Sequence, residues 1–202
     1  MLKWILFAAI TFMTDLRGET KVLAFSGSTR NDSFNKKLAL EAVGIVNTMG
    51  ASALMIDLRD YPMPFYDGDI ETKKGMPDTA KQFRNLMIES QAIIIASPEY
   101  NASVSAILKN ALDWASRNES GQPSRDAFKG KRFAIMSTSP GGGGGGRGLE
   151  HLAAIIENAG GEVVKEKVSV PDAYHAFTAE GCLKNPQVKE KLKREIQELL
   201  KK

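Results

Sequence analysis

The segment Ala92-Ile93-Ile94-Ile95-Ala96 carries the clearest strand signal in the chain. All five residues are apolar, and no polar residue alternates with them. A strand with this pattern is covered on both faces, as strands of a parallel sheet are when helices pack on each side. We therefore place this segment inside a parallel sheet that is buried on both faces.

Outward from this strand, strand-like and helix-like segments alternate. Continuous apolar runs predict further strands at residues 22–25, 53–56 and 133–136, and a fifth strand is predicted at residues 163–170. Apolar residues at helical spacing predict helices at residues 38–49, 78–89, 103–117, 149–159 and 186–200. Five strands alternating with five helices favour a parallel sheet with right-handed crossovers and helices on both faces. The predicted fold is one three-layer α/β domain.

The composition indicates a globular domain and excludes several classes. The chain has 202 residues, 43% hydrophobic and 25% charged, which are not the values of a disordered or fibrous protein. A single cysteine, Cys182, excludes an internal disulfide framework, and with only two histidines we expect no metal site. The net charge is +3, without a dense basic patch, so we expect no nucleic-acid partner.

Residues 1–20 are interpreted as an N-terminal apolar extension outside the domain, which we assign to residues 21–202. The apolar run at residues 4–10 is shorter than the roughly 20 residues that a spanning helix needs, so stable membrane insertion is not expected. The run has the outline of a secretory signal, but no small-x-small cleavage site follows it. The alternatives are an extra tail or a start codon read too early, with Met13 as the true start. We expect a cytoplasmic protein, with export left open by this segment.

Three loops follow predicted strands, at the edge where open parallel sheets bind ligands. The first, residues 26–35, lacks the Gly-Lys-Ser/Thr of a P-loop and the glycines of the dinucleotide fingerprint. It offers hydroxyls, Arg30 and backbone N–H groups at a helix start, which suit a phosphate. The alternative is a serine-capped helix with a solvated arginine.

The other two loops leave their roles open when taken alone. Residues 97–101 (Ser-Pro-Glu-Tyr-Asn) could frame a planar polar ring or form a turn before a helix capped by Ser103. The third loop begins at residues 137–140 and continues through six glycines, Gly141 to Gly146, to Arg147. Such a run suits a backbone that approaches something closely or a mobile flap, and a solvated linker is the alternative.

Taken together, these motifs resemble the NAD(P)H-dependent FMN reductase family, which includes quinone, azo-dye and chromate reductases. The resemblance rests on three stretches in order: Ser26-Gly27-Ser28-Thr29-Arg30-x-x-Ser33-x-Asn35, then Ser97-Pro98-Glu99-Tyr100-Asn101-x-Ser103, then Leu108-Lys109-Asn110-Ala111-Leu112-Asp113-Trp114. A tail similar to the family's Phe-x-x-x-Gly pattern follows at residues 177–181. The resemblance covers residues 21–202 and implies a flavodoxin-like fold.

The resemblance also implies roles for particular residues. The FMN phosphate would bind to the first loop, at Ser28, Arg30, Ser33, Phe34 and Asn35. The ribityl chain and the ring would be lined, largely through backbone groups, by Pro98, Glu99, Tyr100 and Asn101. On the other side of the ring would lie Ser139, Gly141 and Gly142. No catalytic side chain is expected, because the flavin carries the redox chemistry. The helix at residues 103–117 is similar to one at the family's dimer interface, so a homodimer or homotetramer is expected. Lys109, Asp113 and Trp114 are then structural.

We expect an enzyme that passes hydride from NAD(P)H through FMN to a quinone or a similar small acceptor, such as FMN, an azo dye or chromate. The alternative is a flavodoxin-type electron carrier without nicotinamide turnover; such carriers are commonly acidic, whereas this chain is not. A third reading is a fold relative that acts as an interaction module and binds no flavin.

A few further residues receive expectations. Arg147 is a candidate contact for the 2′-phosphate of NADPH, whereas His151, His175 and Cys182 are interpreted as bystanders. Residues 62–66 (Pro-Met-Pro-Phe-Tyr) form a loop that covers either the flavin or a subunit interface.

Overall fold

The computed structural model describes residues 20–201, so the predicted extension lies outside the described residues except for Thr20. The strands are β1 (Lys21–Ser26), β2 (Ser52–Ile56), β3 (Ala92–Ala96), β4 (Glu99–Tyr100), β5 (Ser103–Val104), β6 (Arg132–Thr138), β7 (Glu162–Val163) and β8 (Val168–Val170). The helices are α1 (Phe34–Thr48), α2 (Gly68–Lys74), α3 (Asp78–Glu89), α4 (Ala106–Ala115), α5 (Gly146–Asn158), α6 (Ala173–Ala176) and α7 (Pro186–Leu199), with a 3-10 turn η1 (Leu58–Asp60).

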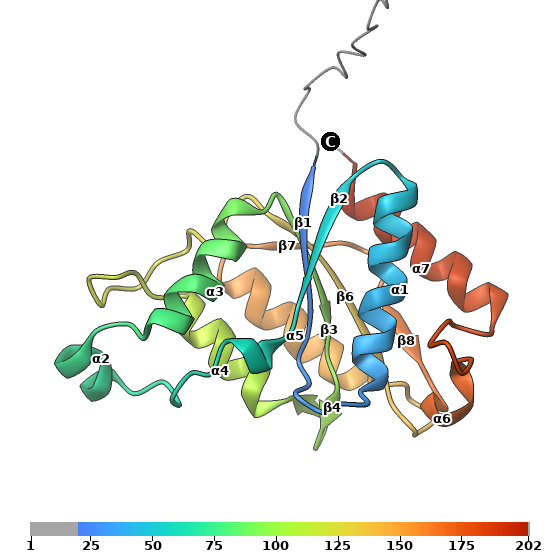
Figure 1. Ribbon diagram of the computed structural model, residues 1–202, viewed down its shortest axis with the longest axis horizontal. Coiled ribbons are helices and arrows are strands. Elements are labelled where there is room, and N and C mark those ends of the chain that lie inside the picture. Colours follow the sequence, from blue (N-terminus) through green and yellow to red (C-terminus); the bar gives the residue numbers. More distant parts are fainter. Residues whose placement is uncertain (1–19, 202) are drawn as a thin grey trace, which may run out of the picture.

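The main sheet is parallel and runs in the order β2-β1-β3-β6-β7, with β8 also paired to β6 (Figure 1). β3 lies in the middle with all five residues buried, as predicted from its unbroken apolar sequence. The strand predicted over residues 163–170 is interrupted. Its first part pairs with the start of β6 and its second part with the end, so β7 and β8 share the fifth position of the sheet.

Two hydrophobic cores lie on opposite faces of the sheet, which confirms the three-layer prediction. One packs α3, α4 and α5 against residues such as Phe25, Ile95 and Phe133. The other packs α1 and α7 against Val22, Ile94 and other residues of the opposite strand faces. In Figure 1, α1 and α7 accordingly lie on one side of the strands and α3, α4 and α5 on the other.

The helix predicted over residues 103–117 begins later than expected. Residues 99–104 form the antiparallel β4–β5 hairpin, and α4 starts at Ala106. Ser105 caps the start of α4, because its Oγ accepts the Leu108 N–H at 3.2 Å. The same hydroxyl donates to the Gly27 carbonyl at 2.6 Å. The N-cap is therefore Ser105, and the alternative of a helix capped by Ser103 is wrong.

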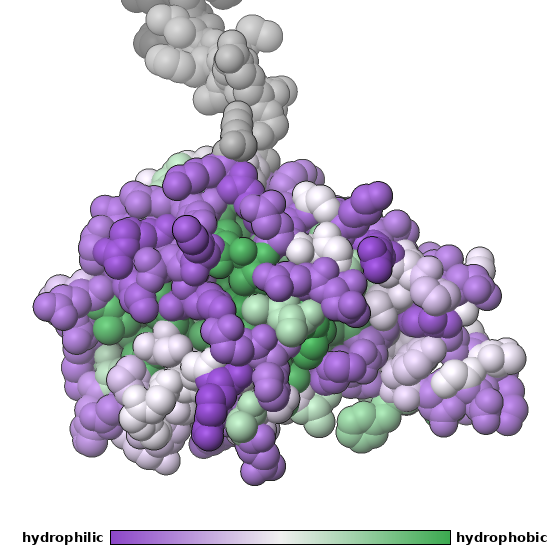
Figure 2. All heavy atoms as spheres, turned by 180° about the vertical axis from the view of Figure 1, so that it is seen from behind, coloured by the Kyte–Doolittle hydropathy of each residue, from purple (hydrophilic) through white to green (hydrophobic). Residues whose placement is uncertain are grey.

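Figure 2, which views the molecule from behind, shows a predominantly hydrophilic face with hydrophobic residues gathered toward its middle. Within residues 20–201, no helix has the length and apolar character required to cross a membrane.

Candidate functional site

The carboxyl ends of β1, β3 and β6 meet in register. Ser26 pairs with Ala96, and Ala96 pairs with Met136. The ladder continues into the loops, because Gly27 N–H donates to the Ala96 carbonyl at 2.9 Å and Ser97 N–H to the Met136 carbonyl at 2.8 Å. The chain leaves β1 toward one edge of the sheet and returns to β3 on the other side, so β1 and β3 flank a switch point, where parallel sheets bind ligands.

Gly27 allows the first loop to pass tightly over α4. A Cβ at this position would lie 2.9 Å from Leu108 Cδ2 and 3.0 Å from Leu108 Cβ, both on the α4 helix. Any larger residue would push the loop away from α4 or displace Leu108. The glycine therefore brings the start of the predicted phosphate loop down onto the core.

The first loop is preorganised by its own hydroxyls. Ser26 Oγ accepts the Ser28 N–H at 3.2 Å, and Ser28 Oγ accepts the Arg30 N–H at 3.3 Å. Ser33 is the N-cap of α1 and accepts the Lys36 N–H. Ser28 and Ser33 are buried, whereas Arg30 is exposed and forms no ion pair with another described residue. An exposed arginine and a helix N-terminus thus lie together at the carboxyl edge, which is the donor set that a phosphate requires.

Phe34 and Asn35 face inward from the first turn of α1. Asn35 hydrogen bonds the backbone of Thr138, so its side chain ties α1 to the end of β6. The Phe34 ring stacks on Phe177 at 6.0 Å between centroids and meets Tyr174 edge-on at 5.5 Å. The structure therefore adds α6 as a fourth segment at this edge. Sequence reasoning noted Phe177 in the tail pattern but missed Tyr174, which is 69% exposed beside Phe34.

The second loop leads into the β4–β5 hairpin, whose turn consists of two residues. Asn101 and Ala102 both have positive φ, at 51° and 65°, as the commonest hairpin turn requires. The left-handed conformation of Ala102 costs roughly 1–2 kcal/mol, so the hairpin contacts must hold it in place. Pro98 is buried and Tyr100 is half exposed, so the predicted ring-binding residues present mainly their backbone and the Tyr100 ring.

The glycine run is an ordered turn and not an open linker. Gly144 N–H donates to the Gly141 carbonyl at 3.2 Å, and Gly146 N–H donates to the Gly143 carbonyl at 3.0 Å. Gly144 and Gly145 are buried at positive φ, and a Cβ on Gly145 would overlap the Ser137 hydroxyl. The close-approach interpretation therefore applies to these two residues. α5 accordingly begins at Gly146, three residues before its predicted start.

Glu99 links the second and third loops. Its Oε1 accepts from Arg147 Nη2 at 2.6 Å and Nε at 3.0 Å, and its Oε2 accepts the Gly148 N–H at 3.1 Å. Burial alone would raise the pKa of the Glu99 carboxyl, but the Gly148 N–H and the Arg147 guanidinium together hold this pKa below its usual value. Arg147, the candidate 2′-phosphate contact, is thus paired within the chain.

The loop after β2 is fixed by α4. The Pro64 carbonyl accepts from Trp114 Nε1 at 2.8 Å and from Asn110 Nδ2 at 3.0 Å, and the Tyr66 N–H donates to Asn110 Oδ1 at 2.8 Å. Trp114 is therefore structural, as predicted. Between these anchors Phe65 protrudes with 74% of its surface exposed.

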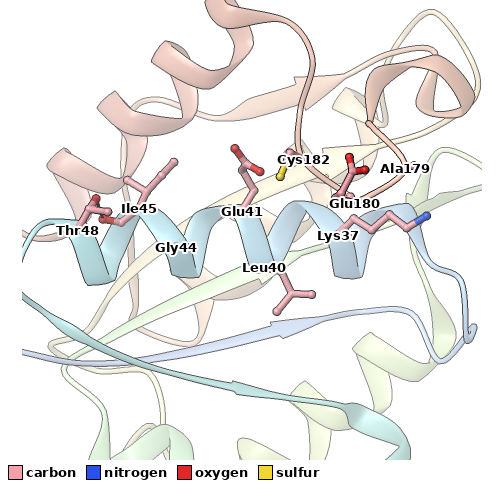
Figure 3. Close-up of a pocket in the computed structure, with 10 residues that line it drawn as sticks. Lys37, Leu40, Glu41, Gly44, Ile45, Thr48, Ala179, Glu180 and Cys182 are labelled. Atoms are coloured by element: carbon pink, nitrogen blue, oxygen red, sulfur yellow. Dashed lines mark hydrogen bonds between the residues drawn. The ribbon is translucent and has the colours of Figure 1, made fainter.

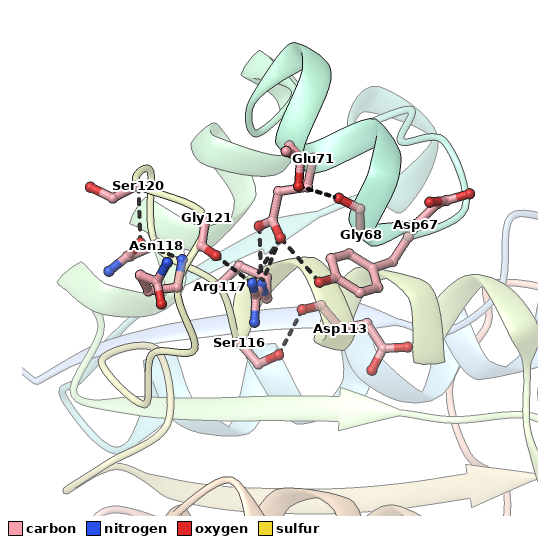
Figure 4. A network of polar contacts seen from close by, with 12 residues as sticks. Asp67, Gly68, Glu71, Asp113, Ser116, Arg117, Asn118, Ser120 and Gly121 are labelled. Carbon is pink, nitrogen blue, oxygen red and sulfur yellow. Dashed lines mark hydrogen bonds and ion pairs between the residues drawn. The ribbon is translucent and has the colours of Figure 1, made fainter.

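A buried ion pair joins α2 to the segment after α4 (Figure 4). Arg117 contacts both Glu71 oxygens at 2.8–3.1 Å and donates to the Gly121 carbonyl, and the Tyr66 hydroxyl donates to Glu71 Oε2 at 3.1 Å. The Arg117 guanidinium lowers the pKa of the Glu71 carboxyl, although burial by itself would raise this pKa. Sequence reasoning missed this network, because the helix α2 was not predicted.

Three residues were predicted to have no role in the site: His151, His175 and Cys182. His151 Nδ1 lies 3.1 Å from Ser103 Oγ, and His175 Nδ1 lies 2.8 Å from Asp172 Oδ1. Cys182 lines a cavity of about 640 Å³ between α1 and the loop at residues 179–182, where Figure 3 shows Glu41 on the side of the helix next to that loop. This cavity lies along α1, and its lining residue Lys37 pairs with Asp32 of the first loop at 2.6 Å.

Comparisons with known proteins fit this geometry. A family model described as NADPH-dependent FMN reductase matches residues 20–175. The chain is 34% identical over 183 residues to an NAD(P)H-dependent FMN reductase of Pseudomonas aeruginosa, covering 90% of this chain and 94% of that protein. It is 36% identical to an NADPH:quinone oxidoreductase of Arabidopsis thaliana, covering 90% of each. The chain therefore belongs to the NADPH-dependent FMN reductase family and is an oxidoreductase.

Solved structures confirm the flavodoxin-like fold. FerB, a flavoenzyme NAD(P)H:(acceptor) oxidoreductase from Paracoccus denitrificans, superposes with a TM-score of 0.73 at 23% identity, covering 89% of this chain and 97% of that one. At this identity the likeness concerns the fold.

Proposed function

We propose that this protein binds FMN at the carboxyl edge of its sheet and reduces quinones or similar small acceptors at the expense of NAD(P)H. The observation that supports this most directly is the convergence of three loops at one switch point, with a phosphate donor set at one of them. The names of the relatives support the same chemistry, since they include FMN and quinone reductases.

The residues present fit the cofactor. Ser28, Ser33 and Arg30 would hold the phosphate together with the first-turn N–H groups of α1, and Phe34 and Asn35 would shape that turn. Pro98, Glu99, Tyr100 and Asn101 would line the ribityl chain and ring mainly through backbone groups, with Ser139, Gly141 and Gly142 on the other side. FMN, when bound, supplies the chemistry that accepts hydride from NAD(P)H and delivers it to the acceptor. The protein contributes position, access and electrostatics.

Three further proposals concern the whole protein. The folded domain extends over residues 21–202 and the preceding residues form an extension. The protein works in the cytoplasm, and it assembles as a homodimer or homotetramer through the face that contains α4.

The test is a visible absorption spectrum of purified protein mixed with FMN and desalted, followed by anaerobic addition of NADPH. The proposal expects a retained flavin band that bleaches on NADPH addition and recovers when a quinone is added. A retained band that NADPH leaves unchanged would favour the electron carrier, and protein without any retained flavin would contradict both.

A further inference from the structure

The N-terminus of α5 has no capping side chain of its own. Its N-cap is Gly145, and the preceding residues are also glycines, so no hydroxyl, amide or carboxylate from this loop accepts the first N–H groups of the helix. The first four N–H groups of a helix have no partner inside the helix and need one from elsewhere. Glu99 meets this need from another loop, because its Oε2 accepts the N–H of Gly148 in the first turn.

We propose that Glu99 is a positioning residue that holds the loops after β3 and β6 at a fixed separation. Its carboxylate reaches from the β4–β5 hairpin to the start of α5. The inference rests on the proposed function, because these two loops are the walls between which the flavin would lie. In this role the Glu99 side chain acts on the loops, while its backbone faces the cofactor.

The surroundings of Glu99 suit a carboxylate in particular. The positive end of the α5 dipole favours a negative group, and Arg147 adds a full positive charge. The Glu99 side chain is only 11% exposed, whereas Arg147 is 78% exposed, so the carboxylate is the buried partner and the arginine covers it from solvent.

Close packing strengthens the same junction. A Cβ on Gly148 would lie 3.2 Å from the Ser103 carbonyl oxygen and 3.3 Å from Glu99 Cβ and Cγ, so glycine lets the helix approach the hairpin. One turn further along α5, His151 Nδ1 contacts Ser103 Oγ. The hairpin and the helix therefore meet along an interface in which Glu99 supplies the charged contact.

The test compares Glu99→Gln, Glu99→Ala and Arg147→Ala with a matched control, Glu150→Gln. Glu150 also lies on α5 and pairs with a cation, Lys167, at 2.7 Å, but it does not touch the hairpin loops. Two quantities are measured: amide hydrogen exchange at Gly148 in protein without FMN, and the dissociation constant for FMN by flavin fluorescence quenching. The kcat for NADPH oxidation is also determined at saturating FMN.

The glutamine variant keeps an oxygen that can accept the Gly148 N–H, whereas the alanine variant does not. We expect Glu99→Ala to speed exchange at Gly148 by about tenfold or more and to weaken FMN binding by about tenfold, the loss of one hydrogen bond to a charged group. Glu99→Gln and Arg147→Ala should fall between this variant and wild type, and Glu150→Gln should match wild type. Glu150→Gln should also keep kcat within about twofold of wild type at saturating FMN, whereas the Glu99 and Arg147 variants are judged on exchange at Gly148 and on FMN affinity.

Unchanged exchange at Gly148 in Glu99→Ala would overturn the inference. Equal loss of FMN affinity in the glutamine and alanine variants, with exchange unaltered, would assign Glu99 to direct flavin contact instead. Wild-type protein that binds no FMN would refute the proposed function separately, because the exchange measurement still tests the link between the loops.

Discussion

The Asn35 side chain forms two hydrogen bonds with the backbone of Thr138, each 3.0 Å long. The amide donates to the Thr138 carbonyl, and the amide oxygen accepts the Thr138 N–H. Both residues are buried, and 103 positions separate them in the chain. This pair fixes the N-terminus of α1 against the carboxyl end of β6, so the first and third loops of the candidate site share one support.

Replacing Asn35 by alanine should therefore destabilise the protein by roughly 2–3 kcal/mol, because two hydrogen bonds are lost and the Thr138 backbone groups stay buried. Urea unfolding followed by circular dichroism measures this loss. Asn47→Ala, which alters an exposed residue of the same helix, should change stability by less than about 0.5 kcal/mol. Equal stability of Asn35→Ala and wild type would show that the pair contributes nothing net.

Arg30→Ala should reduce FMN affinity by about tenfold or more and leave the free energy of unfolding within about 0.5 kcal/mol of wild type. The arginine is exposed and forms no ion pair with another described residue, so it is available to a phosphate and little needed by the fold. Fluorescence titration with FMN checks the affinity. Arg194→Ala, an exposed position on α7, is the control, and unchanged FMN affinity in Arg30→Ala would remove the arginine from the phosphate site.

Gly145→Ala should cost at least about 2 kcal/mol of stability, because the position combines a φ of 88° with a Cβ that would overlap the Ser137 side chain. Gly143→Ala is the matched variant from the same run, since a Cβ there meets no atom within 4 Å. Thermal unfolding of the two variants should separate them clearly. Similar melting temperatures would mean that the glycine run adjusts freely.

Arg117→Ala should destabilise the protein by about 3–5 kcal/mol, because it leaves the Glu71 carboxylate buried without its cation. The double variant Arg117→Ala with Glu71→Gln should recover part of this loss. In wild type, the lowered pKa of Glu71 means that its contribution is present above a pH of about 4.5 and is lost as pH falls through the folded-state pKa. Denaturant unfolding across acidic pH checks both effects; no recovery in the double variant would contradict the charge-burial explanation.

Glu195 predicts the opposite pH dependence. Its carboxyl group is fully buried on α7, and within residues 20–201 neither oxygen has a partner at hydrogen-bond geometry. Burial, with a smaller contribution from Glu166, raises the pKa of Glu195 well above its usual value, although the backbone groups of Ile135 and Val168 and the Lys191 charge oppose this shift. The folded state therefore retains this proton longer than the unfolded chain, and stability falls as pH rises from about 4.5 through the folded-state pKa, by about 1.4 kcal/mol per pH unit.

Glu195→Gln removes this titration, so the variant should gain stability over wild type progressively as pH rises. Unfolding free energies measured at several pH values between 4.5 and 8 give the comparison. Glu190→Gln, an exposed position on the same helix, should leave the wild-type profile unchanged. Parallel profiles for wild type and Glu195→Gln would refute the prediction.

Much of the fold could be predicted from local patterns of apolar residues in the sequence. The uninterrupted apolar run of β3 predicted a strand covered on both faces, and the apolar spacing at residues 78–89 predicted α3 with its observed bounds. These features depend on neighbours in the chain, so sequence reasoning reaches them. The short helices α2 and α6 and the β4–β5 hairpin were missed, because long-range contacts such as Arg117 with Glu71 stabilise them.

The amino-acid sequence by itself determined the alternation of strands and helices and the kinds of side chain that each loop offers. It also determined the family, because the motifs at residues 26–35 and 97–103 stand in order along the chain. Only the tertiary structure decided what those side chains touch. Asn35 turns to Thr138 and Glu99 to the start of α5 because parallel strands in register bring loops from distant parts of the sequence to one edge.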